Sequence, residues 1–150
     1  MARLAEIETA LGILAFGMQH ADDTDAGRES FGDALLRADA FSMLKSRVSL
    51  MQCTTEYPSL VEDSNLRVMD TLRSAFRLEV GYSDHTEGNA VSFAAVARGA
   101  SMIEKHFTLD RTMEGPDHAA SVEPEALKGL VFGIRQVEQA LGNGVKRPSM

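Results

Sequence analysis

The chain has 150 residues, about the length of one domain. It is 44% apolar and 25% charged, a globular composition that excludes collagen-like, low-complexity and broadly disordered chains. Fifteen basic and 22 acidic residues give a formal net charge of −7. This acidic balance, without a basic run, disfavours nucleic acid and anionic lipid as partners, and an anionic substrate would need a local binding site.

The single cysteine and the composition of the N-terminus favour a protein of a reducing compartment. Cys53 alone cannot form an internal disulfide or a zinc site of several cysteines, which suits the cytoplasm. No apolar run approaches the roughly 20 residues that a membrane span needs. The N-terminus is amphipathic with two early glutamates, unlike a signal peptide. We therefore expect a soluble, cytoplasmic protein with no membrane partner.

The first third of the chain predicts two helices and a strand. Apolar residues recur at three- and four-residue steps near the N-terminus: Leu4, Ile7, Leu11 and Leu14. This spacing predicts a helix over residues 3–16. We expect a polar loop at 20–27 and a second helix at 30–44. The short, mostly apolar stretch 47–53 lacks helical caps and predicts a strand.

Helices and strands then alternate. The predicted elements are, in order, a helix at 66–76, a strand at 78–82, a helix at 90–98, a strand at 101–106 and a helix at about 127–141. Gly142 is expected to end the last helix. This alternation favours parallel strands joined by right-handed crossovers. Because three parallel strands cannot close a barrel, two architectures stay open: part of a barrel, which we favour, or an unusually small open sheet.

Residues whose side chains can act in catalysis or bind a ligand follow each predicted strand. They are Thr54, Thr55, Glu56 and Tyr57 after the first, Ser83, Asp84 and His85 after the second, and Glu104, Lys105, His106, Asp110, Asp117 and His118 at the end of the third and after it. The carboxyl ends of strands form the ligand-binding rim of an α/β sheet or barrel. Three such strand ends favour a functional site, although ordinary loop polarity would give a similar pattern.

His85 and His106 are candidate metal ligands. Two imidazoles at neighbouring strand ends can reach one ion, although a strand-end histidine is more often an ordinary hydrogen-bonding residue. Glu104 lies two positions before His106, so both side chains point to one face of a strand. A carboxylate there can orient water, support a metal ligand or pair with a basic residue. Lys105 is expected to point outward, toward helices.

Two hydroxyls and the cysteine complete the candidates. Ser83 and Thr55 can bind phosphate together with loop amides, although both residue types are also common in turns. The glycine-rich motifs of nucleotide-binding folds do not occur. Cys53 is interpreted as a packing residue of a buried strand rather than a nucleophile.

Five motifs in order carry a family resemblance. They are Cys53–Pro58 (CTTEYP), Glu62–Arg67 (EDSNLR), Gly81–Thr86 (GYSDHT), Ile103–Thr108 (IEKHFT) and Gly115–His118 (GPDH). Together they closely resemble the sialic acid synthase (N-acetylneuraminate synthase) family, which includes legionaminate and pseudaminate synthases. The first 45 residues look like the helix and loop before strand six of the same family.

The resemblance implies an enzyme that condenses phosphoenolpyruvate with N-acetylmannosamine or a related acetamido sugar. The products are a nine-carbon 2-keto acid and phosphate. The implied fold is α/β: a partial (β/α)8 TIM barrel over residues 1–150, with the last three strands and their helices. The family's small antifreeze-like domain is expected to be absent. A homo-oligomer is expected, because family members usually form domain-swapped dimers, and the implied cofactor is a divalent metal, manganese or magnesium.

The resemblance also implies roles for individual residues. His85 and His106 resemble the two metal ligands, and Glu104 looks like the catalytic carboxylate near the metal-bound water. The implied substrate contacts are Ser83 and Thr55 at the phosphate of phosphoenolpyruvate, and Tyr57 and Asp117 at the acceptor sugar.

The resemblance covers only three of eight strands. The family's first five strands carry a catalytic glutamate and phosphate-neutralising lysines that do not lie in this chain, so we expect little or no synthase activity from the polypeptide alone. One alternative is a legionaminate-type synthase acting on a 6-deoxy diacetamido sugar, slightly favoured by the acidic segment from Phe16 to Arg28. Another is a non-catalytic half-barrel that self-associates or complements a partner.

Overall fold

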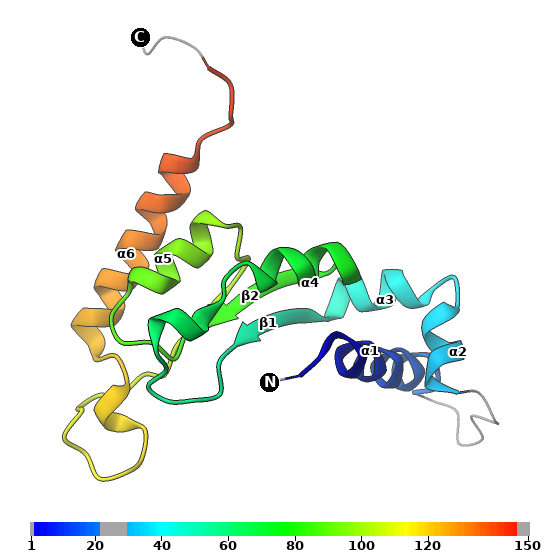
Figure 1. The fold of residues 1–150 in the computed structure, drawn as a ribbon, viewed down its shortest axis with the longest axis horizontal. Coiled ribbons are helices and arrows are strands. Elements are labelled where there is room, and N and C mark those ends of the chain that lie inside the picture. Colours follow the sequence, from blue (N-terminus) through cyan, green and yellow to red (C-terminus); the bar gives the residue numbers. More distant parts are fainter. Residues whose placement is uncertain (1, 22–29, 147–150) are drawn as a thin grey trace. The chain divides into compact units, whose positions relative to one another are not determined.

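The computed structural model describes residues 2–21 and 30–146. Its elements in chain order are α1 (Leu4–Gln19), α2 (Phe31–Leu36), α3 (Ala40–Arg47), β1 (Ser49–Cys53), the 3-10 helix η1 (Val61–Ser64), α4 (Val68–Phe76), β2 (Glu79–Ser83), α5 (Ala90–Ala97), β3 (Ile103–Glu104), the 3-10 helix η2 (His118–Ala120) and α6 (Pro124–Leu141) (Figure 1). The chain divides into two compact units. The first holds the described residues up to 50 with 72–79, and the second holds 51–71 with the described residues from 80 onward.

The first unit is helical, with its own apolar core. This core consists of Leu11, Ala15, Ala40, Leu44 and Leu78. The predicted N-terminal helix is confirmed and runs three residues further than expected, to Gln19. Its start is fixed by Glu6, whose carboxylate accepts the backbone N–H of Arg3 at 2.6 Å. Gly12 allows α1 to approach α2, because a Cβ at Gly12 would lie 2.6 Å from the carbonyl oxygen of Phe31.

The single helix predicted at 30–44 is wrong. The structure has two helices there, and Arg37 between them is extended, with a ψ of 147°. In one continuous helix, Ala34 and Ala40 would lie about 120° apart around the axis. The break allows both alanines to be fully buried. Packing therefore overrides the helical propensity of the connecting residues. Residues 22–27 of the predicted polar loop lie outside the described range.

The second unit contains a three-stranded sheet in the order β1-β2-β3. Strands β2 and β3 pair in parallel, as expected, with Tyr82 opposite Ile103 and Ser83 opposite Glu104. The strand predicted at 101–106 is reduced to Ile103–Glu104. Beyond it the chain pairs with a later loop, because the N–H of Val122 donates to the carbonyl of His106 at 2.9 Å.

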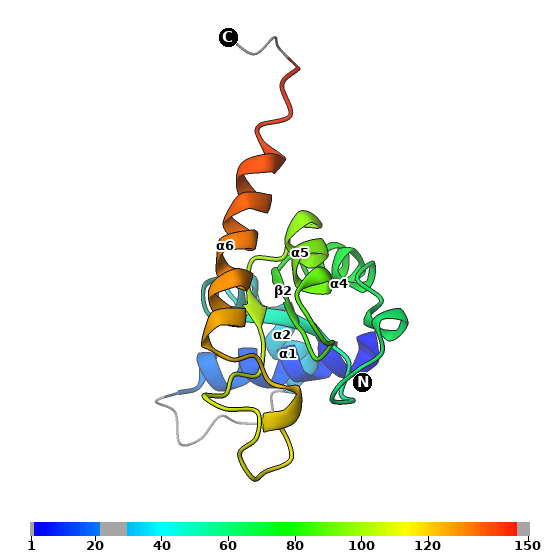
Figure 2. The ribbon, with the colours of Figure 1, turned by 90° about the vertical axis from the view of Figure 1, so that its left-hand side faces the viewer.

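Helices α5 and α6 pack side by side in this unit (Figures 1 and 2). A Cβ at Gly133 of α6 would lie 2.4 Å from the ring of Phe93 on α5, so this glycine permits the close approach. Helix α6 begins at Pro124, three residues earlier than predicted, because proline suits the first turn of a helix. It ends at Leu141, where Gly142 takes a φ of 59°, as predicted. None of the described helices is both long and apolar enough to cross a membrane.

Candidate functional site

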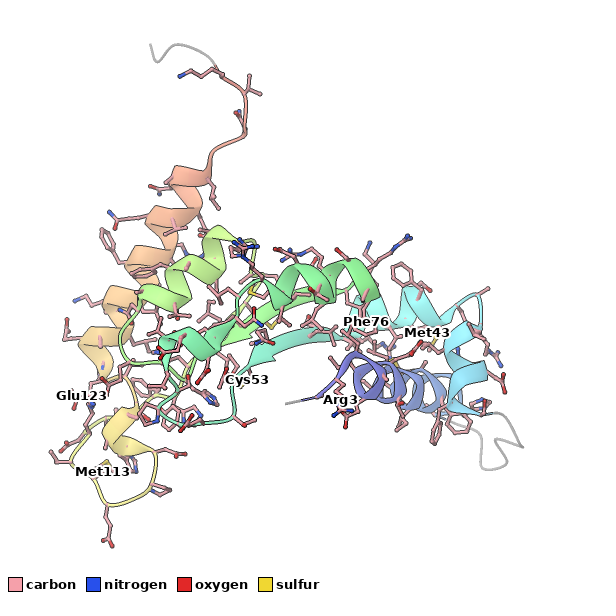
Figure 3. The ribbon with its side chains drawn as sticks, in the orientation of Figure 1. Arg3, Met43, Cys53, Phe76, Met113 and Glu123 are labelled. Atoms are coloured by element: carbon pink, nitrogen blue, oxygen red, sulfur yellow. The ribbon has the colours of Figure 1, made fainter. Side chains whose placement is uncertain are left out.

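The candidate site lies at the carboxyl ends of the three strands, within the second unit. Strand β1 ends at Cys53 (Figure 3), β2 ends at Ser83 and β3 ends at Glu104. The pairing of Ser83 with Glu104 aligns the ends of β2 and β3 in one register. Residues that directly follow these strands therefore meet at one edge of the sheet.

Three aromatic rings, one from the segment after each strand, meet at this edge. The centroids of the His85 and His106 imidazoles are 5.1 Å apart, with the ring planes 74° to each other. The Tyr57 ring lies against both, at 5.1 Å from His85 and 4.1 Å from His106. All three residues are half-buried. We call Tyr57, His85 and His106 the ring cluster.

Polar side chains surround the ring cluster. The Ser83 hydroxyl donates to Glu104 Oε1 at 2.6 Å and lies 3.4 Å from His85 Nε2, so it links the carboxylate to one imidazole. Asp117 Oδ2 lies 3.6 Å from His106 Nδ1. The structure thus brings six predicted site residues together: Tyr57, Ser83, His85, Glu104, His106 and Asp117.

Thr55 and Cys53 differ in their contacts with the ring cluster. Thr55 is exposed on the loop after β1, and none of the contacts that define the ring cluster or its polar neighbours involves it. Cys53 is less buried than its interpretation as a packing residue of a buried strand implies. It is half-buried, and its Sγ lies 3.8 Å from His85 Nε2, because it is the last residue of β1 and faces the imidazole.

The long loop 107–122 is ordered by internal hydrogen bonds. The Thr108 hydroxyl lies 2.7 Å from His118 Nδ1. The hydroxyl and backbone N–H of Thr112 both donate to Asp110, and these bonds lower the pKa of the Asp110 carboxyl. Ser121 closes the loop onto the site by a 3.2 Å hydrogen bond with the Tyr57 hydroxyl. Sequence reasoning missed Ser121, because a serine in a loop carries no distinctive spacing signal.

The other face of the strand ends is buried and ionic, which the sequence reasoning also missed. Asp84 is fully buried, and its carboxylate lies 3.1 Å from the Nζ of Lys105, whose side chain is 5% exposed. Lys105 therefore points away from the ring cluster, as predicted. Tyr82 is also fully buried on β2, and burial raises the pKa of its phenol above the ordinary value. Side chains alternate between the two faces of a strand, and this alternation was the sequence signal that could have placed Asp84 and Lys105 on the buried face.

The described residues contain no group of three or more His, Cys, Asp and Glu side chains placed to hold a metal ion. At the ring cluster, the described His, Cys, Asp and Glu side chains therefore offer at most two ligands to one ion.

Comparison with known proteins shows the family of this chain. The NeuB family matches residues 1–146. The N,N'-diacetyllegionaminic acid synthase of Campylobacter jejuni is 46% identical over 99% of this chain and 37% of its own length. The N-acetylneuraminate-9-phosphate synthase of Mus musculus is 47% identical over 69% of this chain and 29% of its own length. The chain spans about a third of the length of these curated relatives.

Two crystal structures share the fold. One is an N-acetylneuraminic acid synthetase from Leptospira borgpetersenii in complex with citrate, with a TM-score of 0.67 and 34% identity over 94% of this chain and 49% of that one. The other is the spore coat polysaccharide biosynthesis protein SpsE from Bacillus subtilis, with a TM-score of 0.64 and 37% identity over 75% of this chain and 33% of that one. The predicted resemblance and the partial-barrel fold are confirmed: this chain belongs to the NeuB family and forms a C-terminal part of its (β/α)8 barrel.

Proposed function

We propose that this chain carries the metal-binding side of a nonulosonate synthase site, which condenses phosphoenolpyruvate with an acetamido sugar and releases phosphate. The observation that carries the proposal is the convergence of the His85 and His106 imidazoles, 5.1 Å apart, at the strand ends of a NeuB-family barrel. The single free cysteine fits a cytoplasmic location for this reaction.

The residues present fit a manganese or magnesium ion held by two imidazoles. His106 directs Nδ1 toward Asp117, which leaves its other ring nitrogen for a ligand bond, and the carboxylate would help to orient the imidazole. A bound divalent ion would supply Lewis-acid polarisation of the sugar aldehyde. Two imidazole ligands would leave positions for substrate oxygen and water.

The neighbouring polar groups fit the remaining roles. Glu104 holds the Ser83 hydroxyl through one carboxylate oxygen, and its other oxygen is free to orient a water molecule or accept its proton. Ser83 and Thr55 would contact the phosphate of phosphoenolpyruvate. Tyr57 would present its ring edge and hydroxyl to the acceptor sugar, and Asp117 would accept hydrogen bonds from sugar hydroxyls.

Legionaminate-type chemistry is the second candidate for the acceptor sugar. It is supported by the Campylobacter jejuni relative, whose match extends over 99% of this chain, whereas the mouse N-acetylneuraminate-9-phosphate synthase matches over 69%. The match to the legionaminate enzyme therefore includes the first 45 residues. A 2,4-diacetamido-6-deoxy sugar then replaces N-acetylmannosamine as the acceptor, with the same residues in the same roles.

A chimera tests the proposed function. The matching segment of the Campylobacter jejuni synthase is replaced by this chain, and phosphate release is measured with phosphoenolpyruvate, Mn²⁺ and each acceptor sugar in turn. We expect turnover in the chimera, with a clear preference for one sugar. His85→Ala and His106→Ala should abolish turnover, and His20→Ala, outside the ring cluster, should not.

The isolated chain provides the opposite control. It should release little or no phosphate, because the lysines that the family resemblance places in the first five strands are not in it. Robust turnover by the isolated chain, or a folded chimera whose activity survives both histidine substitutions, would contradict the proposal.

A further inference from the structure

We propose that the buried Asp84–Lys105 ion pair is a positioning device that fixes the spacing of the His85 and His106 imidazoles. The proposal rests on the proposed function in one respect: that spacing would allow both imidazoles to bind one cation. None of the side-chain contacts described for Asp84 and Lys105 is with the ring cluster, so both are positioning residues.

The register of β2 and β3 places the ion pair directly behind the imidazoles. Ser83 lies opposite Glu104, and the N–H of Asp84 donates to the carbonyl of Glu104 at 2.8 Å. Continuing this register puts Asp84 opposite Lys105 and His85 opposite His106. Successive residues of an extended chain point to alternate faces. The cross-strand contacts follow this alternation, since Ser83–Glu104 and the imidazoles share one face and the ion pair occupies the other.

The ion pair ties both segments to one buried point. Asp84 Oδ1 accepts the backbone N–H of Thr86 at 2.9 Å and its hydroxyl at 2.7 Å, and Asp84 Oδ2 accepts the Ser92 hydroxyl from α5. The Nζ of Lys105 lies 3.1 Å from Asp84 Oδ2 and also donates to the carbonyl of Thr86 at 2.7 Å. Residues on both sides of His85 are therefore held to the residue that precedes His106.

The imidazoles need such a link because they lie beyond the regular strands. β2 ends two residues before His85, and β3 ends two residues before His106. Backbone hydrogen bonds tie each of them to a different loop: Ser59 donates to the His85 carbonyl at 2.8 Å, and Val122 donates to the His106 carbonyl at 2.9 Å. These two bonds do not join His85 to His106, whereas the ion pair and the Asp84–Glu104 backbone hydrogen bond join their segments directly.

Positioning and overall stability can be separated by removing both charges together. Loss of one partner leaves an uncompensated buried charge, but replacing a buried ion pair with neutral residues of similar size often costs little stability. The double variant Asp84→Asn/Lys105→Met therefore tests positioning in a folded chain. The matched control is Arg135→Met/Glu138→Gln, which removes an exposed ion pair on α6.

The first readout needs no metal. The chain has four histidines, so isotope labelling of histidine gives four ring signals that single substitutions assign. We expect a nuclear Overhauser effect between the His85 and His106 ring protons in the wild type and in the control. In the double variant this cross-peak should weaken several-fold, while the amide signals of α5 and α6 keep their positions.

The second readout is the affinity of the full 150-residue chain for Mn²⁺. It should fall about 10-fold or more in the double variant and stay unchanged in the control. An unweakened cross-peak in the folded double variant, or its absence from the wild type, would overturn the proposal. Loss of the α5 and α6 signals in the double variant would also overturn it, because the pair would then serve the fold as a whole. If the wild type binds no Mn²⁺, the proposed function fails and the ring contact alone decides the positioning role.

Discussion

The two faces of the strand ends after β2 and β3 are built from alternate residues of the same short segments, yet they differ in every physical respect. On one face, Ser83, His85, Glu104 and His106 are polar, adjacent and, apart from the buried Ser83, partly accessible. On the other, Asp84 and Lys105 form an ion pair that is almost entirely removed from water. The comparison teaches that residues one position apart can serve the site and its buried support, and that Asp84 and Lys105 form the buried support.

The largest expected effect comes from breaking the buried face. Asp84→Ala removes one partner of the ion pair and leaves Lys105 charged and buried, which should cost about 3–5 kcal/mol of the free energy of unfolding. Glu104→Ala on the other face should cost about 1 kcal/mol or less, because that carboxylate is exposed and accepts one described hydrogen bond. Urea denaturation of both variants measures the difference, and equal costs would contradict the distinction between the faces.

The next effect concerns the space below Ser83. Gly81 lies on the same face of β2, and a Cβ there would meet Met102 Cγ at 2.3 Å and Met51 Sδ at 2.5 Å. Gly81→Ala should therefore destabilise the chain by about 1–3 kcal/mol through overpacking. Gly129→Ala is the control, since nothing lies within 4 Å of a Cβ in that part of α6. It should stabilise the chain by about 0.5–1 kcal/mol, and thermal unfolding of the two variants checks both signs.

A smaller effect appears at high pH on the buried face. Burial raises the pKa of Tyr82 above its ordinary value of 10.0, so the folded state favours the neutral phenol. The unfolded chain loses the proton first, and stability should therefore decline as the pH rises above about 10. Tyr82→Phe should flatten this decline. Urea denaturation between about pH 9 and 11, the range in which tyrosine titrates, measures this decline in stability. An identical decline in the variant would exclude Tyr82 as the cause.

The smallest effect lies in the exposed loop that carries Asp117. Hydrogen bonds from Thr112 hold the pKa of Asp110 below its ordinary value of 3.8. This contribution is present at neutral pH and is lost as the pH falls through the lowered pKa. Thr112→Val removes the hydroxyl donor and should raise the pKa of Asp110, whereas Thr112→Ser should keep it low. A carbon NMR titration of the carboxyl group checks this, and no difference between the two variants would contradict it.

Local sequence patterns predicted the element order and the site neighbourhood well. The alternation of helices and strands, the stop at Gly142 and the gathering of Tyr57, Ser83, His85, Glu104, His106 and Asp117 all follow from period, caps and the rule that strand ends share an edge. These features depend on residues near one another in the chain, or on one topological rule, so a single sequence carries them.

Features that depend on tertiary packing were not predictable in the same way. The break between α2 and α3 occurs at ordinary residues, because burial of Ala34 and Ala40 decides it rather than a proline or glycine signal. The short length of β3 goes with a contact far along the chain, because the N–H of Val122 donates a hydrogen bond to the His106 carbonyl. The half-buried position of Cys53 beside His85 likewise follows from the sheet order and not from its apolar strand.

The most direct test of the central claim is a titration of the 150-residue chain with Mn²⁺, followed by electron paramagnetic resonance. We expect one bound ion per chain in the wild type. We also expect a loss of affinity of about 10-fold or more in each of His85→Ala and His106→Ala, with His20→Ala unchanged. Unchanged affinity in both ring-cluster variants would contradict the claim that these two imidazoles hold one cation.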